Sequence, residues 1–195
     1  MKKHKILLVD DEENVLNSLK RALRGEFFDV ETTTNPEQAV LIAETGTVSL
    51  IVSDHQMPQM TGVEMFKKIK ESNPHIIRIM LTGKADLEDT VQAINEGEVF
   101  RFIRKPWDDI DLKITIRHAL MHYDLWTQNR YLQDEVKKQH ETLMKLENEY
   151  PGIAKRGKIK NGKEIFTIKE DNLPESMDDL VMKYFPLKKA ALTGS

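Results

Sequence analysis

The feature that most constrains the fold is a series of short apolar runs that recur along the chain. The central run, Leu50-Ile51-Val52, continues through Ser53 and stops at the carboxylate of Asp54. A short, continuous apolar run is typical of a strand buried on both faces, as in a parallel sheet. Comparable runs occupy residues 5–9, 30–34, 76–81 and 99–103.

Segments with the apolar spacing of helices separate these runs. Asn35-Pro36 supplies a helix N-cap followed by proline at the first helical position, and Gly25 and Gly97 mark helix ends. The expected helices span residues 10–25, 36–44, 62–72 and 86–96. This alternation predicts an α/β fold over residues 1–122, with a doubly wound, five-stranded parallel sheet covered on both faces.

Residues 108–150 contain neither proline nor glycine and are expected to form one long helix. From Leu125 its apolar positions alternate in steps of four and three residues, which is the heptad repeat of a coiled coil. Asn129 falls at an inner position, where a lone asparagine favours a parallel two-stranded coil. The alternative is an amphipathic helix that folds back on its own domain. The expected coiled-coil seam comprises Leu125, Asn129, Leu132, Val136, Gln139, Leu143, Leu146 and Tyr150.

A small α+β tail is expected over residues 151–189. Pro151-Gly152 ends the long helix, and Asn161-Gly162 is the dipeptide most typical of a tight hairpin turn. Leu173-Pro174 then begins a short helix. Because a hairpin and one helix bury little surface alone, the tail is expected to pack on the coil or on a partner. Residues 190–195 are expected to be a disordered end or a cloning remnant.

Composition excludes several classes of function. The 29 basic and 32 acidic side chains give a formal net charge of −3, so no general attraction to nucleic acid or to an anionic membrane is expected. The chain has no cysteine, which excludes disulfides, zinc–thiolate sites and thiol catalysis. The apolar run at residues 6–9 is too short for a signal peptide or a membrane span, so a soluble cytoplasmic protein is expected.

Polar groups follow four of the five predicted strands. They are Asp10, Asp11, Asp54, Thr82 and Lys105. Because the carboxyl ends of parallel strands share one edge of the sheet, these groups are expected to lie together. Each also has a simpler interpretation, as a helix cap, a turn hydroxyl or a solvated cation. Three carboxylates in one place would repel one another without a cation between them, and hard oxygen ligands suit Mg²⁺.

These groups lie within longer motifs that resemble a known family, the CheY-like receiver domain of bacterial two-component response regulators. The matching motifs are, in chain order, Asp10-Asp11, D-x-x-M-P-x-M-x-G from Asp54 to Gly62, Thr82-Gly83 and Lys105-Pro106. The resemblance covers residues 4 to about 122. It implies a flavodoxin-like fold with strand order 2-1-3-4-5 and a cis peptide bond before Pro106.

The resemblance also implies roles for the clustered groups. Asp54 would accept a phosphoryl group from the histidine of a sensor kinase or of a phosphotransfer protein, forming an aspartyl phosphate. Mg²⁺ would be the cofactor, held by Asp10, Asp11, Asp54 and the backbone carbonyl of Gln56. Lys105 would place a second positive charge beside the phosphoryl oxygens.

A conformational switch is implied as well. Thr82 would bond the phosphoryl group, and its movement would let Phe102 turn from outward to inward. The face formed by the fourth helix, fifth strand and fifth helix would then change shape. Phe102 lacks the hydroxyl of the tyrosine frequent at this position, so its inward state needs no hydrogen-bond partner. Gln56 and Lys84 occupy positions that tune the lifetime of the phosphoryl group in this family.

Two classes of output fit the sequence. The first is a signalling switch, not an enzyme, that forms a homodimer through the coil and docks on another protein. The second is a transcription regulator whose basic run, Lys155 to Lys163, meets DNA phosphates. We favour the first, because only one helix is expected after the hairpin and a helix-turn-helix is not available. His140-Glu141 resembles the start of a kinase phosphoacceptor box, but no nucleotide-binding region or cyclic-dinucleotide enzyme signature is present.

Overall fold

The structure, a computed structural model, describes residues 3–83, 99–149, 154–156 and 166–168. Its contacts divide the chain into two compact units, Met1–Gln128 and Asn129–Ser195. The expectations for Lys84, Tyr150, the helix over 86–96, the Asn161-Gly162 turn and the helix from Leu173 lie outside the described residues.

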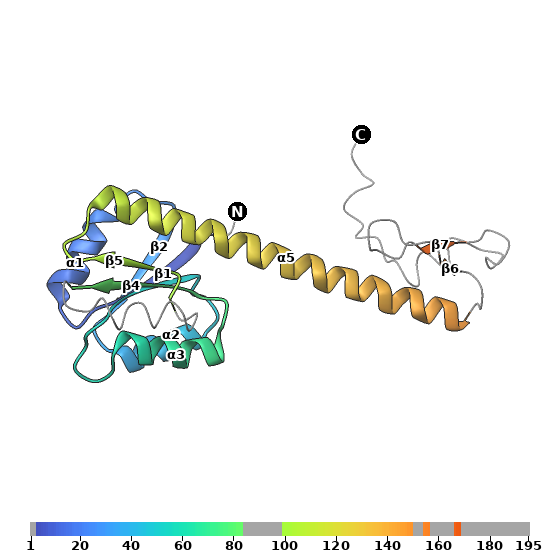
Figure 1. The fold of residues 1–195 in the computed structure, drawn as a ribbon, viewed down its shortest axis with the longest axis horizontal. Helices are drawn as coiled ribbons and strands as arrows, with labels where there is room; N and C mark the ends of the chain where they lie inside the picture. The colour runs from blue at the N-terminus through green and yellow to red at the C-terminus, as the bar shows by residue number, and fades with distance from the viewer. Residues whose placement is uncertain (1–2, 84–98, 150–153, 157–165, 169–195) are drawn as a thin grey trace. The chain divides into compact units, whose positions relative to one another are not determined.

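A five-stranded parallel sheet forms the centre of the first unit (Figure 1). Its strands are β1 (His4–Val9), β2 (Phe28–Thr33), β3 (Leu50–Asp54), β4 (Ile77–Thr82) and β5 (Arg101–Arg104). They lie in the order β2-β1-β3-β4-β5, and all four neighbouring pairs are parallel. The predicted fold class and strand order are therefore confirmed.

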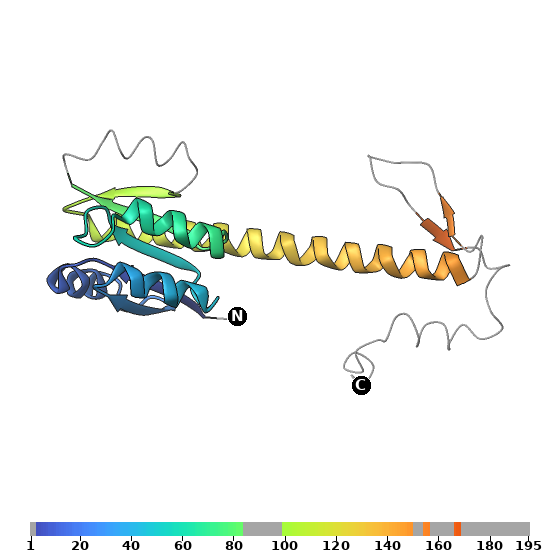
Figure 2. The same cartoon turned by 90° about the horizontal axis from the view of Figure 1, so that it is seen from below.

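Helices cover both faces of this sheet (Figures 1 and 2). α1 (Glu13–Ala22) and the first part of α5 (Asp109–Glu149) pack on one face, while α2 (Pro36–Glu44) and α3 (Gly62–Ser72) pack on the other. Alternate residues of a strand point to opposite faces. In β1, Ile6 and Leu8 accordingly join the α1/α5 core, and Leu7 and Val9 join the α2/α3 core.

Local capping sets the starts of α2 and α3, which begin where the sequence predicts. The Asn35 side chain accepts hydrogen bonds from the backbone of Glu37 (2.8 Å) and Gln38 (3.2 Å). Thr61 and Glu64 form a capping box, in which each side chain accepts a bond from the other's backbone N–H. The capping box fixes the end of the loop that follows Asp54.

α5 is a single helix of 41 residues, as expected for the long helix. Within the first unit it buries Leu112, Ile116, Ala119 and Leu120. Of the predicted seam, Leu125, Leu132 and Val136 are exposed, Leu143 is partly buried, and Leu146 is buried within the single chain. The exposed part of the seam therefore ends before Leu146, and its pairing with a second chain stays a prediction.

In the second unit, β6 (Ala154–Arg156) pairs antiparallel with β7 (Phe166–Ile168). The antiparallel pairing agrees with the predicted hairpin, but its register differs by one residue, because Arg156 pairs with Phe166 whereas a two-residue turn at Asn161-Gly162 would pair it with Thr167. Among the described helices, none combines the length and the apolar composition needed to cross a membrane.

Candidate functional site

Asp54, the last residue of β3, is buried and held on both carboxylate oxygens. The backbone N–H of Gln56 donates to Oδ2 at 2.9 Å, and Lys105 Nζ lies 2.6 Å from Oδ1. The loop after Asp54 is anchored at both ends, because His55 N–H donates to the carbonyl of Leu81 and Gly62 N–H donates to the carbonyl of His55. These bonds hold the acid at the carboxyl edge of the sheet.

Asp10 follows β1 directly and is completely buried. Its Oδ1 accepts a hydrogen bond from the backbone N–H of Glu12 at 3.0 Å, which shapes the loop before α1. Its neighbour Asp11 is exposed. The two aspartates of the pair thus have different surroundings, and only Asp10 carries the cost of a buried charge.

Lys105 connects the two buried acids. Its Nζ donates to Asp10 Oδ2 at 2.8 Å and also lies within bonding distance of Asp54. Its backbone N–H donates to the carbonyl of Thr82 at 2.8 Å, and the peptide bond to Pro106 is cis. The ends of β1, β3, β4 and β5 therefore meet at one edge of the sheet, as the sequence predicts.

Burial and pairing with opposite charges shift the pKa values of Asp10 and Lys105 in opposite directions. Burial raises the pKa of the Asp10 carboxyl, and the hydrogen bonds from Lys105 and Glu12 offset only part of that rise. Burial alone would lower the pKa of the Lys105 ammonium. Its hydrogen bonds to Asp10 and Asp54, together with their negative charge, outweigh burial and raise that pKa. Lys105 is therefore positively charged at neutral pH, and the charge on Asp10 is the costly one.

Asp10→Asn is expected to raise the free energy of unfolding at pH 7 by about 1 kcal/mol, because it removes a buried charge while Lys105 keeps Asp54 as a partner. The folded-state pKa of Asp10 is raised, so the native chain loses stability as the pH rises from the unfolded pKa through the folded one. The asparagine cannot ionise, so that part of the pH dependence should disappear. Urea unfolding between about pH 4 and pH 7 measures both effects.

Asp11→Asn is the matched control, since Asp11 is exposed and its loss should change stability by only a few tenths of a kcal/mol at most. Equal stability of the native chain and Asp10→Asn at pH 7 would contradict the cost assigned to this buried charge.

The two residues predicted to form the switch lie on adjacent strands. Thr82 is buried at the end of β4, opposite Arg104 of β5. Phe102 pairs with Met80 across β4 and β5, is partly buried, and packs against the α2/α3 core. Of the two residues predicted to tune phosphoryl lifetime, Gln56 is exposed beside Asp54.

Gly62 is a site residue to which sequence reasoning gave no role. A Cβ atom at this position would overlap the backbone carbonyl oxygen of Asp54 and would stand 3.3 Å from Met80 Cε. The first residue of α3 must therefore be glycine for the helix to approach the end of β3 so closely. The motif contains this glycine, but only the folded chain brings it against Asp54.

The family comparison agrees with this geometry. The family model described as the response regulator receiver domain matches residues 6–117, which is more than half of the chain. The chain belongs to the response regulator receiver family. The receiver motifs and the strand order predicted from the sequence are therefore those of its actual family.

Curated relatives share this receiver. The hydrogenase transcriptional regulatory protein HoxA of Cupriavidus necator is 37% identical over 115 residues, or 59% of this chain and 24% of HoxA. The DNA-binding transcriptional regulator NtrC of Salmonella typhimurium is 29% identical over 128 residues, or 66% of this chain and 27% of NtrC. The chain thus spans only about a quarter of the length of these relatives.

Solved structures show the same similarity. A response regulator receiver domain protein from Clostridium thermocellum is 30% identical with a TM-score of 0.59, covering 63% of this chain and 98% of that one. A structure described as an adenylate cyclase from Rhodopirellula baltica is 37% identical with a TM-score of 0.65, covering 68% of this chain and 98% of that one. Both similarities cover about two thirds of this chain.

The donor set of this receiver fits Mg²⁺. Within the described residues, no three His, Cys, Asp or Glu side chains gather closely enough to hold a metal ion by themselves. Mg²⁺ does not require such a group, because it is usually held by one or two carboxylates, waters and phosphate oxygens. The buried carboxylates of Asp10 and Asp54, both bonded to one ammonium group, supply suitable oxygens.

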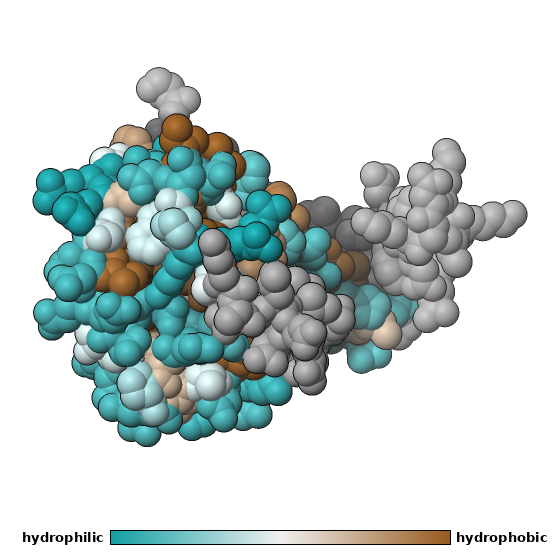
Figure 3. Space-filling view, turned by 60° about the vertical axis from the view of Figure 1, so that its left-hand side comes forward, coloured by the Kyte–Doolittle hydropathy of each residue, from teal (hydrophilic) through white to brown (hydrophobic). Residues whose placement is uncertain are grey.

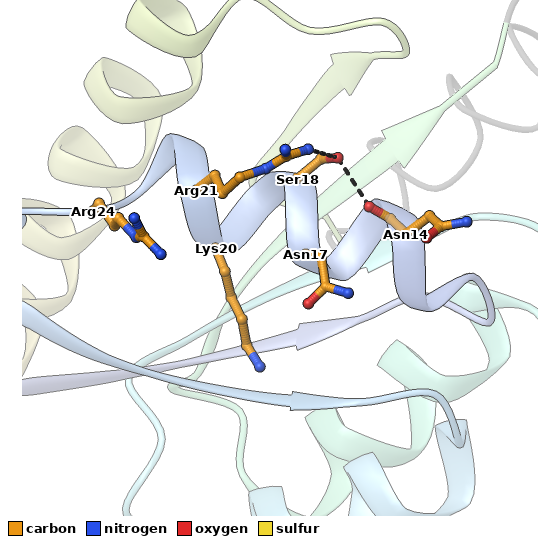
Figure 4. Close-up of a pocket in the computed structure, with 6 residues that line it drawn as sticks. All are labelled: Asn14, Asn17, Ser18, Lys20, Arg21 and Arg24. Carbon is orange, nitrogen blue, oxygen red and sulfur yellow. Dashed lines mark hydrogen bonds between the residues drawn. The ribbon is translucent and has the colours of Figure 1, made fainter.

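Two hollows on the surface of the receiver are lined by residues other than Asp10, Asp54 and Lys105. One lies along α1 and the residues just after it, where the Arg21 side chain runs along the helix and donates to Ser18, which in turn donates to the carbonyl of Asn14 (Figure 4). A second, polar groove runs between α1 and Thr32-Thr33-Thr34. The face seen in Figure 3 is mostly hydrophilic, with apolar side chains in separate small patches.

Proposed function

We propose that this receiver accepts a phosphoryl group on Asp54 from the phosphohistidine of a sensor kinase or a phosphotransfer protein. The observation that carries the proposal is the position of Lys105, whose ammonium group lies between the buried carboxylates of Asp10 and Asp54. A purely structural ion pair would need one acid. Two buried acids around one cation leave a net negative charge, which suits a site that receives a further cation and a phosphoryl group.

The chain's own residues supply the nucleophile and its positioning. An oxygen of Asp54 attacks phosphorus, the bond from phosphorus to the histidine nitrogen breaks, and the imidazole leaves. Gln56 N–H keeps the carboxylate oriented, and Lys105 offsets negative charge on the phosphoryl oxygens. When bound, Mg²⁺ supplies further charge neutralisation, with Asp10, Asp11, Asp54 and the Gln56 carbonyl as its proposed ligands.

In this proposal the chain is a phosphoacceptor that catalyses only its own phosphorylation and dephosphorylation. Thr82 then bonds the phosphoryl group, and Phe102 turns inward. Two observations support this route. Thr82 is buried at the end of β4, and its carbonyl accepts the backbone bond from Lys105. Phe102 is partly buried, so its ring can be accommodated by a modest rearrangement of the α2/α3 core.

The proposal includes a homodimer formed through the coiled-coil seam. Leu125, Leu132 and Val136 are between 55% and 65% exposed in the single chain, and such a row of large apolar side chains favours a protein partner. Phosphorylation would be passed to that dimer through α5, and from it to a downstream protein.

Light-scattering mass and small-angle scattering with Mg²⁺ and beryllium fluoride, a phosphoryl mimic, test this function. The native chain is expected to change mass or shape when both are added, and Asp54→Ala is expected not to respond. A response of equal size in Asp54→Ala would overturn the proposal, because the mimic would then act elsewhere.

A second candidate function is transcription regulation, which the names of the relatives HoxA and NtrC favour. The part of those proteins that this chain matches is about a quarter of their length, so the likeness covers the receiver and not a DNA-binding region. A salt-dependent mobility shift of duplex DNA by the full chain would favour this candidate.

A further inference from the structure

The hollow along α1 is rich in positive charge and in hydrogen-bond donors. It measures about 590 Å³, and the described residues that line it include neither an acidic nor an apolar side chain. All of them belong to α1 or to the two residues after it (Figure 4). They are Asn14, Asn17, Ser18, Lys20, Arg21 and Arg24. The hollow therefore suits an anionic ligand that accepts several hydrogen bonds.

The three cations of this hollow are not used in ion pairs. Within residues 3–83 and 99–149, Lys20, Arg21 and Arg24 have no acidic partner, whereas Lys3, Lys5 and Arg117 each have one. Lys20 and Arg21 lie in the last turn of α1, where the helix dipole favours cations. The dipole does not account for Arg24, which follows the helix, and it leaves the N–H donors of all three able to bond a ligand.

The next two acids along the chain do not offset this charge. Both carboxylate oxygens of Glu26 accept bonds from the Arg117 guanidinium, at 2.8 and 2.9 Å, and the Glu26 side chain is only 10% exposed. Asp29 forms an ion pair with Lys3 at 2.6 Å. The end of α1 therefore carries a local excess of positive charge, although the formal net charge of the chain is −3.

An exposed aromatic ring lies close to these cations. Phe27 is 93% exposed, whereas the next residue, Phe28, is buried. Because Glu26 on one side is bonded to Arg117 and Phe28 on the other is part of the core, the backbone on both sides of Phe27 is held in place. Three residues of chain span at most about 11 Å, so Phe27 lies within that distance of Arg24, measured between Cα atoms.

These residue types indicate the class of ligand. Arg, Lys, Ser and Asn side chains provide most protein contacts to the phosphates and sugars of nucleic acids. Exposed aromatic rings stack on unpaired bases. A protein partner would instead bind around an apolar interface core, and the side chains that line this hollow are all polar or charged. The combination favours a nucleic acid strand over an acidic protein.

We propose that this surface binds single-stranded nucleic acid. We call it the α1 patch, and it comprises Lys20, Arg21, Arg24 and Phe27. The three cations bond successive phosphates and Phe27 stacks on a base, which must be unpaired to reach the ring. The inference goes beyond phosphoryl transfer and does not depend on it.

The α1 patch and the acid cluster lie at opposite edges of the sheet. Phe28 pairs with His4, the first residue of β1, so Phe27 stands at the amino edge of the sheet. Asp54 ends β3 at the carboxyl edge. A strand bound at Phe27 therefore leaves Asp54 accessible to a phosphodonor.

Fluorescence anisotropy with a labelled oligothymidylate of about ten nucleotides tests the inference on the full chain. Replacing Lys20, Arg21 and Arg24 together by glutamine is expected to raise the dissociation constant at least about tenfold at low salt. Each phosphate contact to a single strand contributes about −0.7 to the slope of log K against log salt concentration, so the slope should lose about 2 in magnitude.

A matched control separates a local site from general electrostatic attraction. Lys67, Lys68 and Lys70 lie on α3, which packs on the other face of the sheet. Their joint replacement by glutamine changes the net charge by the same amount and is expected to affect binding far less. Equal losses in the two triple variants would overturn the inference.

Substitutions of Phe27 test stacking separately from charge. Phe27→Ala is expected to raise the dissociation constant at least about fivefold without changing the salt slope, because it removes a stacked ring and no charge. Phe27→Leu keeps an apolar side chain without an aromatic face and should behave like Phe27→Ala, whereas Phe27→Trp should bind as well as the native chain. Equal binding by Phe27→Leu and the native chain would contradict stacking.

Two further outcomes would overturn the inference. Poly-glutamate that binds as tightly as the oligonucleotide, with the same dependence on Phe27, would identify an acidic protein as the ligand. Loss of oligonucleotide binding on joint replacement of Lys155, Lys158 and Lys160 by glutamine, with no loss in the α1 patch variants, would place the site in the basic run. Phosphoryl uptake from acetyl phosphate should stay at the native level in every α1 patch variant, so a failure of the proposed phosphoryl transfer is measured separately.

Discussion

Asp54→Asn is expected to abolish phosphoryl uptake from a small phosphodonor such as acetyl phosphate in the presence of Mg²⁺. The asparagine amide has nearly the shape of the carboxylate but cannot serve as the nucleophile that forms an acyl phosphate. Its oxygen can still accept the bond from Lys105 or from Gln56 N–H, so the fold should persist. Intact-mass spectrometry, supported by a thermal melt of the same sample, measures both properties. We expect uptake at least ~100-fold below that of the native chain.

Asp109→Asn is the matched control. Asp109 is an exposed aspartate in the first turn of α5, and the proposal gives it no part in phosphoryl transfer. It should take up one phosphoryl group as the native chain does. Uptake of one phosphoryl group by Asp54→Asn would instead show that the acceptor is another residue. Asp10 and Asp11 would then be the next residues to replace.

The parts of the fold that follow local rules could be predicted from the sequence. Asn35-Pro36 begins α2 and Gly62 begins α3, because the signals that start these helices lie within three residues of the start. The ends of the strands are predicted less accurately. The second strand was predicted over 30–34, whereas β2 spans Phe28–Thr33. Asp29 obscured its beginning, because this charged residue on an edge strand pairs with Lys5 and forms an ion pair with Lys3.

The fifth strand is predicted over 99–103, whereas β5 spans Arg101–Arg104. Here too the difference arises from contacts with the neighbouring strand. The Phe100 N–H already donates to the carbonyl of Arg78 at 2.7 Å, so the strand approaches β4 before its regular ladder begins. An apolar run predicts where a segment is buried, but the ladder depends on the neighbouring strand. Strand boundaries at the sheet edges are therefore the least predictable from sequence.

The candidate site shows the same division. The residue types at the ends of the strands, and their meeting at one edge, followed from the parallel alternation. The different burial of Asp10 and Asp11 could not be predicted, because the sequence presents two identical neighbouring residues. Only the path of the loop before α1 buries the first and exposes the second. The double contact of Lys105 depends on its side chain reaching past the end of β4 to the acids that follow β1 and end β3, which no local pattern contains.

Gly62→Ala is expected to be among the most damaging small substitutions in the receiver. The added methyl group would overlap the backbone carbonyl of Asp54. Displacing a backbone atom at the end of a buried strand costs free energy, because the surrounding core is closely packed. We expect a loss of about 2–3 kcal/mol in the free energy of unfolding. Because relief of the overlap must displace β3 or α3, phosphoryl uptake should slow as well.

Gly46→Ala separates this overlap from the ordinary cost of replacing a glycine. Gly46 has a φ of 68°, where any other residue is strained, but nothing lies within 4 Å of the Cβ that would be added. Its replacement should therefore cost only about 1 kcal/mol and leave uptake unchanged. Urea unfolding and intact-mass spectrometry on the two variants make the comparison. If Gly62→Ala were no more costly than Gly46→Ala, the close approach of α3 would not be what holds Asp54 in position.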